Sequence, residues 1–326
     1  MYRIGVDIGG TFTDLVVVED AGAVHFGKIA STPEDQSIGV MAGLDMMAGR
    51  LLMPLVAMLG QTERIVHGMT VATNALLERK GARLGLLTTE GHRDVLEMRE
   101  GLKPERYNLR LPRHPALAPR ALRFGVRERM RDTGSVETSL DMDSLDTAIE
   151  ALRGEKVEAI AVCYLHAYAN PVHEQQTRDR LAELLPDVYV SLSSDVLPQI
   201  KEYERVSTTA VNAYVGPALE RYLAQLQNRL KETGYSGPAL ITLSHGGVAP
   251  ISEAIRLAAG TVLSGPAGGL AGARHASGVL DVGDLIPFDM GGTSTDISLI
   301  VDGETTLSSD RVVAGERIAL SSLDIV

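Results

Sequence analysis

The chain has 326 residues, of which 44% are hydrophobic and 22% charged, a composition typical of an ordinary globular protein of about two domains. Its formal net charge of −11 argues against nucleic acid or an anionic membrane as the main partner. The single cysteine, Cys163, allows no intrachain disulfide and fits a reducing compartment. We expect no secretory signal, because no basic segment followed by an apolar one opens the chain, and no membrane span, because the longest strongly apolar stretch, 51–59, is short and contains Pro54. Cytoplasmic residence is therefore the expectation.

Apolar periodicity and turn residues predict an alternation of strands and helices. Thr32-Pro33-Glu34-Asp35 is predicted to begin the first helix, with Thr32 as its cap. Strands are predicted at 2–8, 15–18, 23–29, 65–67, 84–88, 124–130, 157–165, 188–192 and 239–243. Helices are predicted at 32–49, 73–80, 143–154, 172–185, 204–231 (with a break at Gly216-Pro217 as one interpretation), 252–259 and 266–279. This alternation favours a parallel or mixed sheet covered by helices.

The segment 99–121 differs from its surroundings because it is polar, basic and rich in proline. It is predicted to be an ordered loop or lid without regular secondary structure. A solvated connection and a functional lid both remain open as interpretations.

One octapeptide pattern occurs twice, as Asp7-Ile-Gly-Gly-Thr-Phe-Thr-Asp14 and as Asp289-Met-Gly-Gly-Thr-Ser-Thr-Asp296, identical at six of eight positions. Each copy lies between two apolar stretches, which predicts a strand, a tight turn and a second strand. Adjacent glycines let backbone N–H groups approach a charged ligand closely, and the threonines add hydroxyl donors. The acid before each turn is suited to holding Mg²⁺ through water. Two such hairpins could hold a phosphate tail from both sides.

The repeated pattern differs from the commoner phosphate-binding loops. A Walker-type loop needs Gly-x-x-x-x-Gly-Lys-Ser/Thr before a helix, and the dinucleotide fingerprint also needs a helix after its glycines. Here a strand is predicted after each glycine pair. A plain hairpin turn is the structural alternative for one copy, but two matching copies make it less favoured.

Five segments of the chain resemble motifs of the hydantoinase A/5-oxoprolinase family, within the actin-like ATPase superfamily. Two are the hairpins, which resemble that family's phosphate motifs. The others are His67-Gly-Met-Thr-Val-Ala-Thr-Asn-Ala-Leu76, Glu202-Tyr-Glu-Arg-Val-Ser-Thr-Thr-Ala-Val-Asn212 and Ser264-Gly-Pro-Ala-Gly-Gly269. The chain departs from the family pattern at two positions. Met69 stands where the family frequently has threonine, and His245 stands where it often has asparagine.

The resemblance implies an α/β fold of the actin-like ATPase (ribonuclease H-like) type, with duplicated domains and mixed sheets flanked by helices. Residues 1–200 would form the hydantoinase/oxoprolinase N-terminal domain with the first phosphate hairpin. Residues 201–326 would begin the hydantoinase A domain with the second. Family members are longer than this chain, so the second domain is expected to be incomplete and to lack the adenosine-binding segment.

The implied function is that of an ATP-dependent hydrolase subunit. It would phosphorylate the carbonyl oxygen of a cyclic amide (hydantoin, 5-oxoproline or lactam) to activate ring opening. One alternative is the ATP-binding subunit of an acetone/acetophenone-type carboxylase, acting on a ketone enol or bicarbonate. A second is a small-molecule kinase or a nucleotide-driven reactivase or chaperone. The resemblance also implies ATP and Mg²⁺ as cofactors and a hydantoinase B-like second subunit as partner.

By resemblance, Asp7 and Asp289 are catalytic and organise Mg²⁺ through water. The expected phosphate-binding residues are Gly9, Gly10, Thr11 and Thr13 in the first hairpin and Gly291, Gly292, Thr293 and Ser294 in the second. Asp14 and Asp296 have an alternative role, which is to hydrogen-bond the hairpin backbone.

His67, Thr70, Thr73 and Asn74 are the candidates for the substrate side in the first half of the chain. His67 would act as proton donor or acceptor. A histidine beside glycine is more often a structural residue, and that alternative remains open.

Glu204 and Arg205 are the candidates in the second half. Glu204 is assigned to substrate binding, and Arg205 to pairing with a substrate carboxylate or carboxyphosphate. The alternatives are an ion pair between the two, or a solvated helix start. Ser207-Thr208-Thr209 has local capping as its alternative.

Overall fold

The computed structural model describes residues 1–325 except 33, 102–104, 106 and 291–294. The chain divides into two compact units, each discontinuous in sequence. The first unit consists of Met1–Asn74, Ala218–Ser308 and Ser321–Val326, and the second of Ala75–Pro217 and Ser309–Leu320. The predicted domain boundary at residue 200 stays a prediction.

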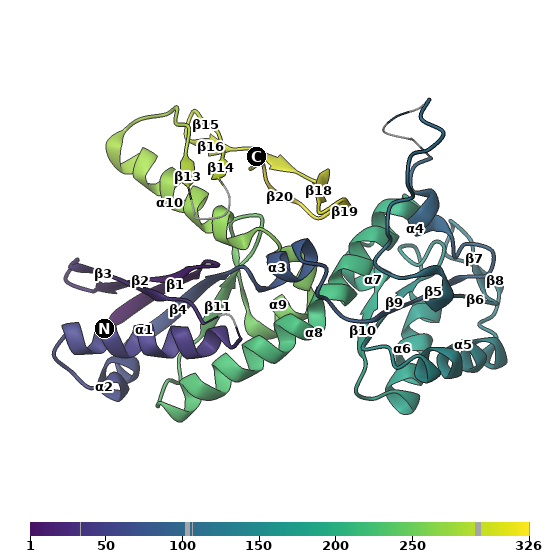
Figure 1. Cartoon of the computed structure of the whole chain (residues 1–326), viewed down its shortest axis with the longest axis horizontal. Coiled ribbons are helices and arrows are strands. Elements are labelled where there is room, and N and C mark those ends of the chain that lie inside the picture. Colours follow the sequence, from purple (N-terminus) through teal and green to yellow (C-terminus); the bar gives the residue numbers. More distant parts are fainter. Residues whose placement is uncertain (33, 102–104, 106, 291–294, 326) are drawn as a thin grey trace. The chain divides into compact units, whose positions relative to one another are not determined.

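A six-stranded mixed sheet forms the centre of the first unit (Figure 1). Its strands, in spatial order, are β12 (Val248–Pro250), β11 (Ala239–Thr242), β4 (Thr62–Met69), β1 (Tyr2–Ile8), β2 (Phe12–Glu19) and β3 (Val24–Ala30). β1, β2 and β3 form an antiparallel meander, while β4 and β11 lie parallel to β1 and to each other. Buried residues alternate with partly or fully exposed ones along β1, as expected for a strand whose faces have different environments.

Helices cover both faces of this sheet. α1 (Gln36–Arg50) packs on one face, where a Cβ on Gly43 would meet the side chains of Leu15 and Ile29. α10 (Ser264–Leu280) packs on the other, beside β4 and β11 (Figure 1). Glycine in α1 therefore lets the helix approach the strands closely.

The cap of α1 is Asp35, whose side chain accepts a hydrogen bond from the Ser37 N–H group. The predicted cap was Thr32, so the observed cap lies three residues later in the chain. The Thr32 hydroxyl donates to the Asp35 carbonyl and accepts from the Gly39 N–H group, so it holds the loop before the helix. Asp35 also pairs with Arg229 at 2.9 Å. An acid at the positive end of a helix is favoured over a hydroxyl that lies further out.

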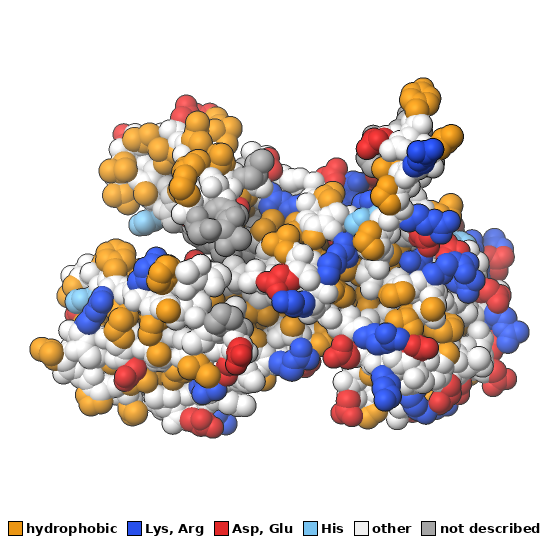
Figure 2. Space-filling model, viewed as in Figure 1, with side chains coloured by type: hydrophobic (Ala, Val, Ile, Leu, Met, Phe, Trp, Pro, Cys, Tyr) orange, Lys and Arg blue, Asp and Glu red, His pale blue; other side chains and the backbone are white. Residues whose placement is uncertain are grey.

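The remaining elements of the first unit are short. The helices are α2 (Leu55–Gly60), α3 (Val71–Leu77, which begins in this unit), α9 (Ile251–Arg256) and the 3-10 turn η2 (Ala258–Thr261). The strand pairs are β13 (Phe288–Met290) with β14 (Thr295–Ile297), β15 (Ile300–Val301) with β16 (Glu304–Thr305), and β17 (Leu307–Ser308) with β20 (Ser322–Leu323). Figure 2 shows hydrophobic side chains gathered over the part that Figure 1 labels α10, β13 and β15. Ile286, Met290 and Val279 are among those exposed there.

The second unit is built on a parallel sheet of four strands. In spatial order these are β10 (Tyr189–Leu192), β9 (Ala159–Cys163), β5 (Leu84–Thr89) and β6 (Arg123–Val126). Its other elements are α4 (Val95–Met98), η1 (Arg120–Leu122), α5 (Met142–Gly154), α6 (Val172–Leu184), α7 (Ser193–Val196), β7 (Arg129–Met130) with β8 (Val136–Thr138), and β18 (Arg311–Val313) with β19 (Glu316–Ile318). Every residue of β5 and β9 is buried, as expected of a parallel sheet covered on both faces.

α5 shows why these sequences form packed helices. Asp141 caps it by accepting from the Ser144 N–H group. Leu145, Ala148, Ile149 and Leu152 recur at helical spacing and are buried against the second unit's core. This helix matches the prediction for 143–154.

α8 (Glu202–Glu232) is one continuous helix with Pro217 inside it, so the break considered at Gly216-Pro217 is absent. Residues up to Pro217 belong to the second unit and later residues to the first. Proline costs a helix one hydrogen bond, and extensive burial around Pro217 offsets that loss.

The predicted α/β class with helices flanking a mixed sheet is confirmed. The described residues of 99–119 contain neither helix nor strand, as predicted, but Arg120 and Ala121 belong to η1, so the prediction for 99–121 is wrong at its end. Residues 102–104 and 106 lie outside the described residues. Within the described part of the chain, no helix combines the length and apolar character that a membrane span requires.

Candidate functional site

The first predicted phosphate hairpin is formed by β1, β2 and the turn between them. Gly9 N–H donates to the Phe12 carbonyl at 2.9 Å and closes the turn. Gly10 and Thr11 are exposed at its tip, so their backbone N–H groups and the Thr11 hydroxyl face solvent or a ligand.

Thr13 lies in a different environment from Gly10 and Thr11. It is 1% exposed, and its hydroxyl is 3.0 Å from the Ser31 hydroxyl. Ser31 in turn donates to the Gly9 carbonyl at 2.8 Å. Thr13 therefore supports the turn from within the sheet, and its predicted contact with phosphate stays a prediction.

Asp7 lies at the end of β1 with its side chain accessible to solvent. Partial desolvation by the surrounding protein raises the pKa of Asp7 above its ordinary value, and the charges of Asp14 and Asp289 raise it further, in that order. Lys28 opposes this shift but forms its ion pair with Asp14, at 2.8 Å. Asp7 thus lies near two other carboxylates, and its predicted role in organising Mg²⁺ stays a prediction.

The second hairpin has the same strand register as the first. Asp289 pairs with Asp296 across β13 and β14, just as Asp7 pairs with Asp14 across β1 and β2. Gly291, Gly292, Thr293 and Ser294, which would form its turn, lie outside the described residues. The duplicated sequence pattern therefore corresponds to a duplicated strand arrangement.

The N-terminal half of α10 brings the two aspartates together. A Cβ on Gly265 would lie 3.5 Å from Asp7 Oδ1, and a Cβ on Gly269 would lie 3.9 Å from Asp289 Oδ2. A Cβ on Gly68, which is adjacent to Gly265, would approach Asp7 Oδ1 to 2.7 Å. Glycines thus line a space that holds two carboxylates, and any larger residue at 68 would displace Asp7.

His67 lies on the opposite face of the sheet from Asp7. Asp7 and Gly68 are register partners on one face, and His67, one residue earlier, points to the other. It is 1% exposed, with Nδ1 3.3 Å from the Val6 carbonyl and Nε2 2.6 Å from the Tyr222 hydroxyl. Nδ1–H donates to the carbonyl, so Nε2 accepts from the hydroxyl. Burial lowers the pKa of His67 to about 4, and these contacts fit the structural interpretation of this residue.

The other residues predicted on the substrate side of the first unit lie at the start of α3. Thr73 Oγ1 accepts from the Leu263 N–H group at 2.9 Å, which ties α3 to the start of α10. The Asn74 amide donates to the Thr70 hydroxyl at 3.2 Å, and both side chains are partly exposed. Met69, where the family often has threonine, is fully buried. Thr70 and Asn74 therefore keep polar groups available near α10, and their substrate role stays a prediction.

Glu204 and Arg205, both in the second unit, are buried, so the solvated helix start considered for them is wrong. They do not pair with each other in the described structure. Glu204 lies 3.2 Å from Lys201 and 3.8 Å from Arg317. Burial acts to raise the pKa of Glu204, but hydrogen bonds and these two cations together lower it. Arg205 Nη1 donates to the Tyr164 carbonyl and to the Ser193 hydroxyl.

Hydroxyls follow Arg205 along α8. Thr208 and Thr209 each donate to the carbonyl four residues earlier, so they bond within the helix and do not cap its start. Ser207 donates to the Arg317 carbonyl at 2.8 Å.

Family models match both halves of the chain. Residues 3–185 match the hydantoinase/oxoprolinase N-terminal region, and residues 205–326 match hydantoinase/oxoprolinase. The chain belongs to the hydantoinase/oxoprolinase family.

Named relatives within this family include several enzymes. The chain is 36% identical over 326 residues to caprolactamase subunit alpha of Pseudomonas jessenii, covering 99% of this chain and 47% of that protein. It is 33% identical over 312 residues to the acetophenone carboxylase gamma subunit of Aromatoleum aromaticum, covering 92% of this chain and 42% of that protein. The chain therefore spans about half the length of the curated relatives it matches.

Two solved structures share the fold. A nucleotide-free acetone carboxylase structure matches with a TM-score of 0.91 at 30% identity, covering 100% of this chain and 48% of that chain. The ATP-dependent caprolactamase from Pseudomonas jessenii matches with a TM-score of 0.90 at 36% identity, covering 100% and 47%. The predicted resemblance to the hydantoinase/oxoprolinase family and its fold is confirmed.

The described residues contain no group of three or more His, Cys, Asp and Glu side chains arranged to hold a metal ion. The predicted role of Asp7 and Asp289 is to bind Mg²⁺ through water, which needs no such group. The raised pKa of Asp7, caused by burial and then by the charges of Asp14 and Asp289, and the glycine-lined space around it fit a hydrated cation with a phosphate tail.

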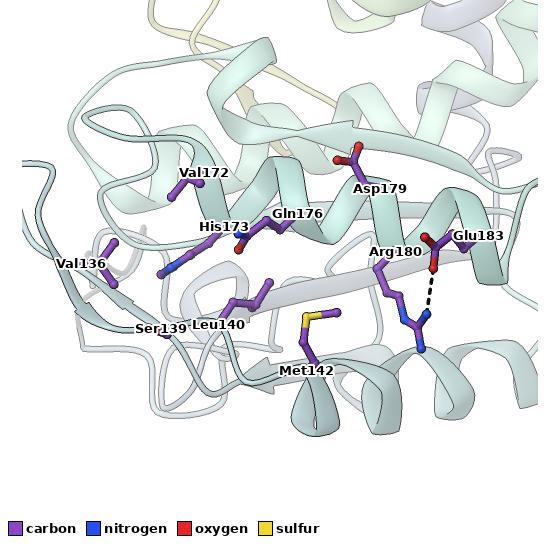
Figure 3. A pocket seen from close by; sticks show the side chains of 10 residues that line it. All are labelled: Val136, Ser139, Leu140, Met142, Val172, His173, Gln176, Asp179, Arg180 and Glu183. Atoms are coloured by element: carbon purple, nitrogen blue, oxygen red, sulfur yellow. Dashed lines mark hydrogen bonds and ion pairs between the residues drawn. The ribbon is translucent and has the colours of Figure 1, made fainter.

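A surface pocket of about 540 Å³ in the second unit does not include the described residues predicted for the family site. It lies beside α6 and the start of α5, and His173 and Arg180 are among its lining residues (Figure 3). Arg180 is already neutralised, by Glu183 at 2.8 Å and Asp146 at 2.7 Å. This pocket therefore offers no free cation to an anionic substrate.

Sequence reasoning missed Lys28 and Ser31. Lys28 lies on the face of Asp7 and Asp14, and Ser31 holds the first hairpin turn. The predicted strand at 23–29 gave a partial indication, because antiparallel pairing brings the end of this strand back to the hairpin turn. Identifying Lys28 and Ser31 individually also required the register of that pairing.

Proposed function

We propose that this chain is the ATP-binding part of an enzyme that activates a carbonyl oxygen by phosphorylation, with a cyclic amide as the substrate class. The observation that carries the proposal is the pair of hairpins in the same register, whose aspartates lie against one helix. The caprolactamase relative supports a cyclic amide. The carboxylase relatives support a ketone or bicarbonate as the alternative substrate.

The proposed reaction has three balanced steps. The substrate's carbonyl oxygen takes the terminal phosphoryl group of ATP, and ADP leaves. One water molecule then adds to the activated carbon, and the ring carbon–nitrogen bond breaks to release the amine and leave an acyl phosphate. A second water molecule hydrolyses the acyl phosphate to a carboxylate and inorganic phosphate. An amide is stabilised by resonance, and phosphorylation replaces a poor leaving group by a good one, while the protein mainly positions the reactants and offsets charge.

This chain's residues would contribute binding and orientation. The exposed turn at Gly10 and Thr11 would donate hydrogen bonds to phosphate oxygens, and Asp7 and Asp289 would hold Mg²⁺ through its water shell. Bound Mg²⁺ would supply charge compensation for the phosphates. The second turn, at 291–294, is proposed to contribute in the same way as the first.

A second subunit is proposed for the later steps. The named relatives are the alpha subunit of caprolactamase, the gamma subunit of acetophenone carboxylase and the beta subunit of acetone carboxylase, each part of a multisubunit enzyme. We propose a hydantoinase B-like protein as the partner of this chain, with both proteins in the cytoplasm.

The test is ADP release by the intact protein with its companion subunit and Mg²⁺. The substrates are caprolactam, 5-oxoproline, hydantoin, and acetone or acetophenone with bicarbonate. We expect ADP release that depends on a cyclic amide and that is lost in Asp289→Asn. The control is Asp45→Asn, which removes an exposed acid of α1. ATP turnover independent of every compound would overturn the proposal and favour a reactivase or chaperone, and a stable phosphorylated product would favour a kinase.

A further inference from the structure

The second unit contains a pocket at the carboxyl edge of its parallel sheet. The chain segments that follow β5 and β9 line it, through His92 and His166, and Arg205 of α8 closes one side. Its volume is about 410 Å³, within the range of small-molecule sites.

This edge is the topological switch point of the sheet. β5 and β9 are neighbours, but the chain leaves β5 toward β6 on one side and leaves β9 toward β10 on the other. In open α/β sheets, the loops after two such strands diverge and leave a crevice, and ligands bind there. The topology thus places a binding crevice where the pocket is found.

Three arginines line the pocket, and none has an acidic partner in the described part of the chain. Arg99 donates to the Tyr203 hydroxyl at 2.8 Å and to the Gly315 carbonyl at 2.9 Å. Arg205 hydrogen-bonds a carbonyl and a hydroxyl, and its guanidinium lies over the Tyr168 ring at 5.6 Å. Arg129 forms no described ion pair or hydrogen bond through its side chain, and its charge contributes, after burial, to lowering the pKa of His92.

The acids nearby are already committed or lie at the rim. Asp94 lines the pocket but pairs with Arg120 at 2.8 Å. Glu202 lines it with an exposed side chain. Buried Glu174 reaches Arg205 only through the Ser193 hydroxyl, which donates to Glu174 at 2.6 Å. Buried Glu128, whose charge also acts on His92, pairs with His173 at 2.8 Å. Among the lining residues themselves, three arginines therefore face two acids.

Arg205 shows most clearly that a partner is expected. It is 2% exposed, and its Nε has no hydrogen-bond partner among the described residues. The buried Nδ1 of His92, on the same pocket, also has none. A buried charge without a partner is costly, and buried polar atoms usually have a hydrogen-bond partner. Arg205 Nε and His92 Nδ1 are therefore candidates to bind a ligand.

We propose that this pocket binds a small organic carboxylate, held by Arg129 and Arg205. Guanidinium groups match a carboxylate in charge and planar geometry. The remaining lining includes Val95, Met98, Leu165 and Val206, which suits a short apolar body attached to the carboxylate. Inorganic phosphate would satisfy the arginines but would leave this apolar lining without a contact. The proposal rests on the second unit alone and does not depend on the proposed phosphoryl transfer.

The test is calorimetric titration of the intact protein without ATP, in a phosphate-free buffer, because the sequence contains no tryptophan to report binding. The probes are acetate, butyrate, neutral butyramide and inorganic phosphate. We expect butyrate to bind more tightly than acetate and butyramide not to bind. Binding of butyramide as tight as that of butyrate, or binding of phosphate without any carboxylate, would overturn the assignment.

Variants locate the site. Arg129→Gln is expected to weaken butyrate binding by about tenfold or more, since hydrogen bonds to charged groups are among the stronger ones. It removes no described hydrogen bond of the fold, so it should remain folded. Arg180→Gln is the matched control, because it removes an arginine from the other pocket of the same unit, where the charge is already paired. Arg205→Lys tests the buried position. Unchanged binding in folded Arg129→Gln would contradict the proposal.

Discussion

Asp7 and Asp289 face one helix, α10, at glycines one helical turn apart. These are Gly265 and Gly269, where Cβ atoms would lie 3.5 Å and 3.9 Å from the respective carboxylate oxygens. The two acids come from hairpins far apart in sequence, and the charge of Asp289 adds to the raised pKa of Asp7. Like charges held together disfavour the ligand-free fold, and the proposed Mg²⁺ would offset this repulsion.

The first prediction concerns Asp7→Asn. Because the pKa of Asp7 is raised, the folded protein binds a proton here more readily than the unfolded chain does. The free energy of unfolding therefore increases as pH falls from the raised pKa of Asp7 in the folded protein toward its ordinary pKa in the unfolded chain. The neutral amide should raise the melting temperature of the ligand-free protein at pH 7 by about 1–2 °C, since the side chain is partly solvated. The gain should shrink at pH 4, as thermal unfolding at both values would show.

The same variant should lose activity while gaining stability. We expect Asp7→Asn to abolish ATP turnover by the intact enzyme, whereas Asp45→Asn, an exposed acid of the same unit, should change neither property. A lowered melting temperature for ligand-free Asp7→Asn at pH 7 would show that Asp7 stabilises the fold and would contradict this account.

The second prediction concerns Gly68→Ala. The new Cβ would lie 2.7 Å from Asp7 Oδ1, a distance that forces the carboxylate to rotate away. Only the end of a short side chain must move, so the melting temperature should change little. ATP turnover should fall by about tenfold or more, since small displacements of reacting groups are costly. Gly5→Ala is the control from β1, because its Cβ would meet only Val16, at 4.0 Å. Equal turnover of the two variants would count against the placement of Asp7.

Local patterns allowed the hairpins and most helices to be predicted, because strand alternation, glycine pairs and capping residues act over a few positions. α2 was missed, since its residues were considered only as part of the apolar stretch 51–59. The continuity of α8 through Pro217 was also uncertain, because burial by distant segments decides whether a proline is tolerated. Tertiary context prevails over local preference at both places.

The site residues divide in the same way. Asp7 and Asp289 were predictable from the repeated motif. The opposite orientation of His67 was not, because it depends on the register between β1 and β4, which no local pattern determines. The proximity of Gly265 to Asp7 depends likewise on how α10 packs against the sheet.

The third prediction concerns the pH dependence of stability through His67. Burial lowers its pKa to about 4, so the unfolded chain binds a proton at this residue before the folded protein does as pH falls. Stability should decrease between pH 6.5 and about 4, by about 3 kcal/mol in total from this group. The melting temperature of His67→Gln should fall less steeply over this range than that of the unaltered protein. His245→Gln, at an exposed histidine, should retain the original slope. Parallel slopes for all three proteins would contradict the assignment of a buried, neutral His67.

The last prediction concerns Gly216, where α8 passes close to the ring of Tyr189. A Cβ at this position would overlap the aromatic ring, so alanine requires the ring or the helix to shift. We expect Gly216→Ala to destabilise the protein by about 1–3 kcal/mol, although alanine is the better helix former. Gly272→Ala in α10 is the matched control, because nothing lies within 4 Å of its Cβ. There the helix preference acts alone and should stabilise the protein by about 0.5–1 kcal/mol. Thermal unfolding should therefore move the two melting temperatures in opposite directions. A rise for both would mean that α8 has room beside Tyr189, so that close packing does not explain glycine at 216.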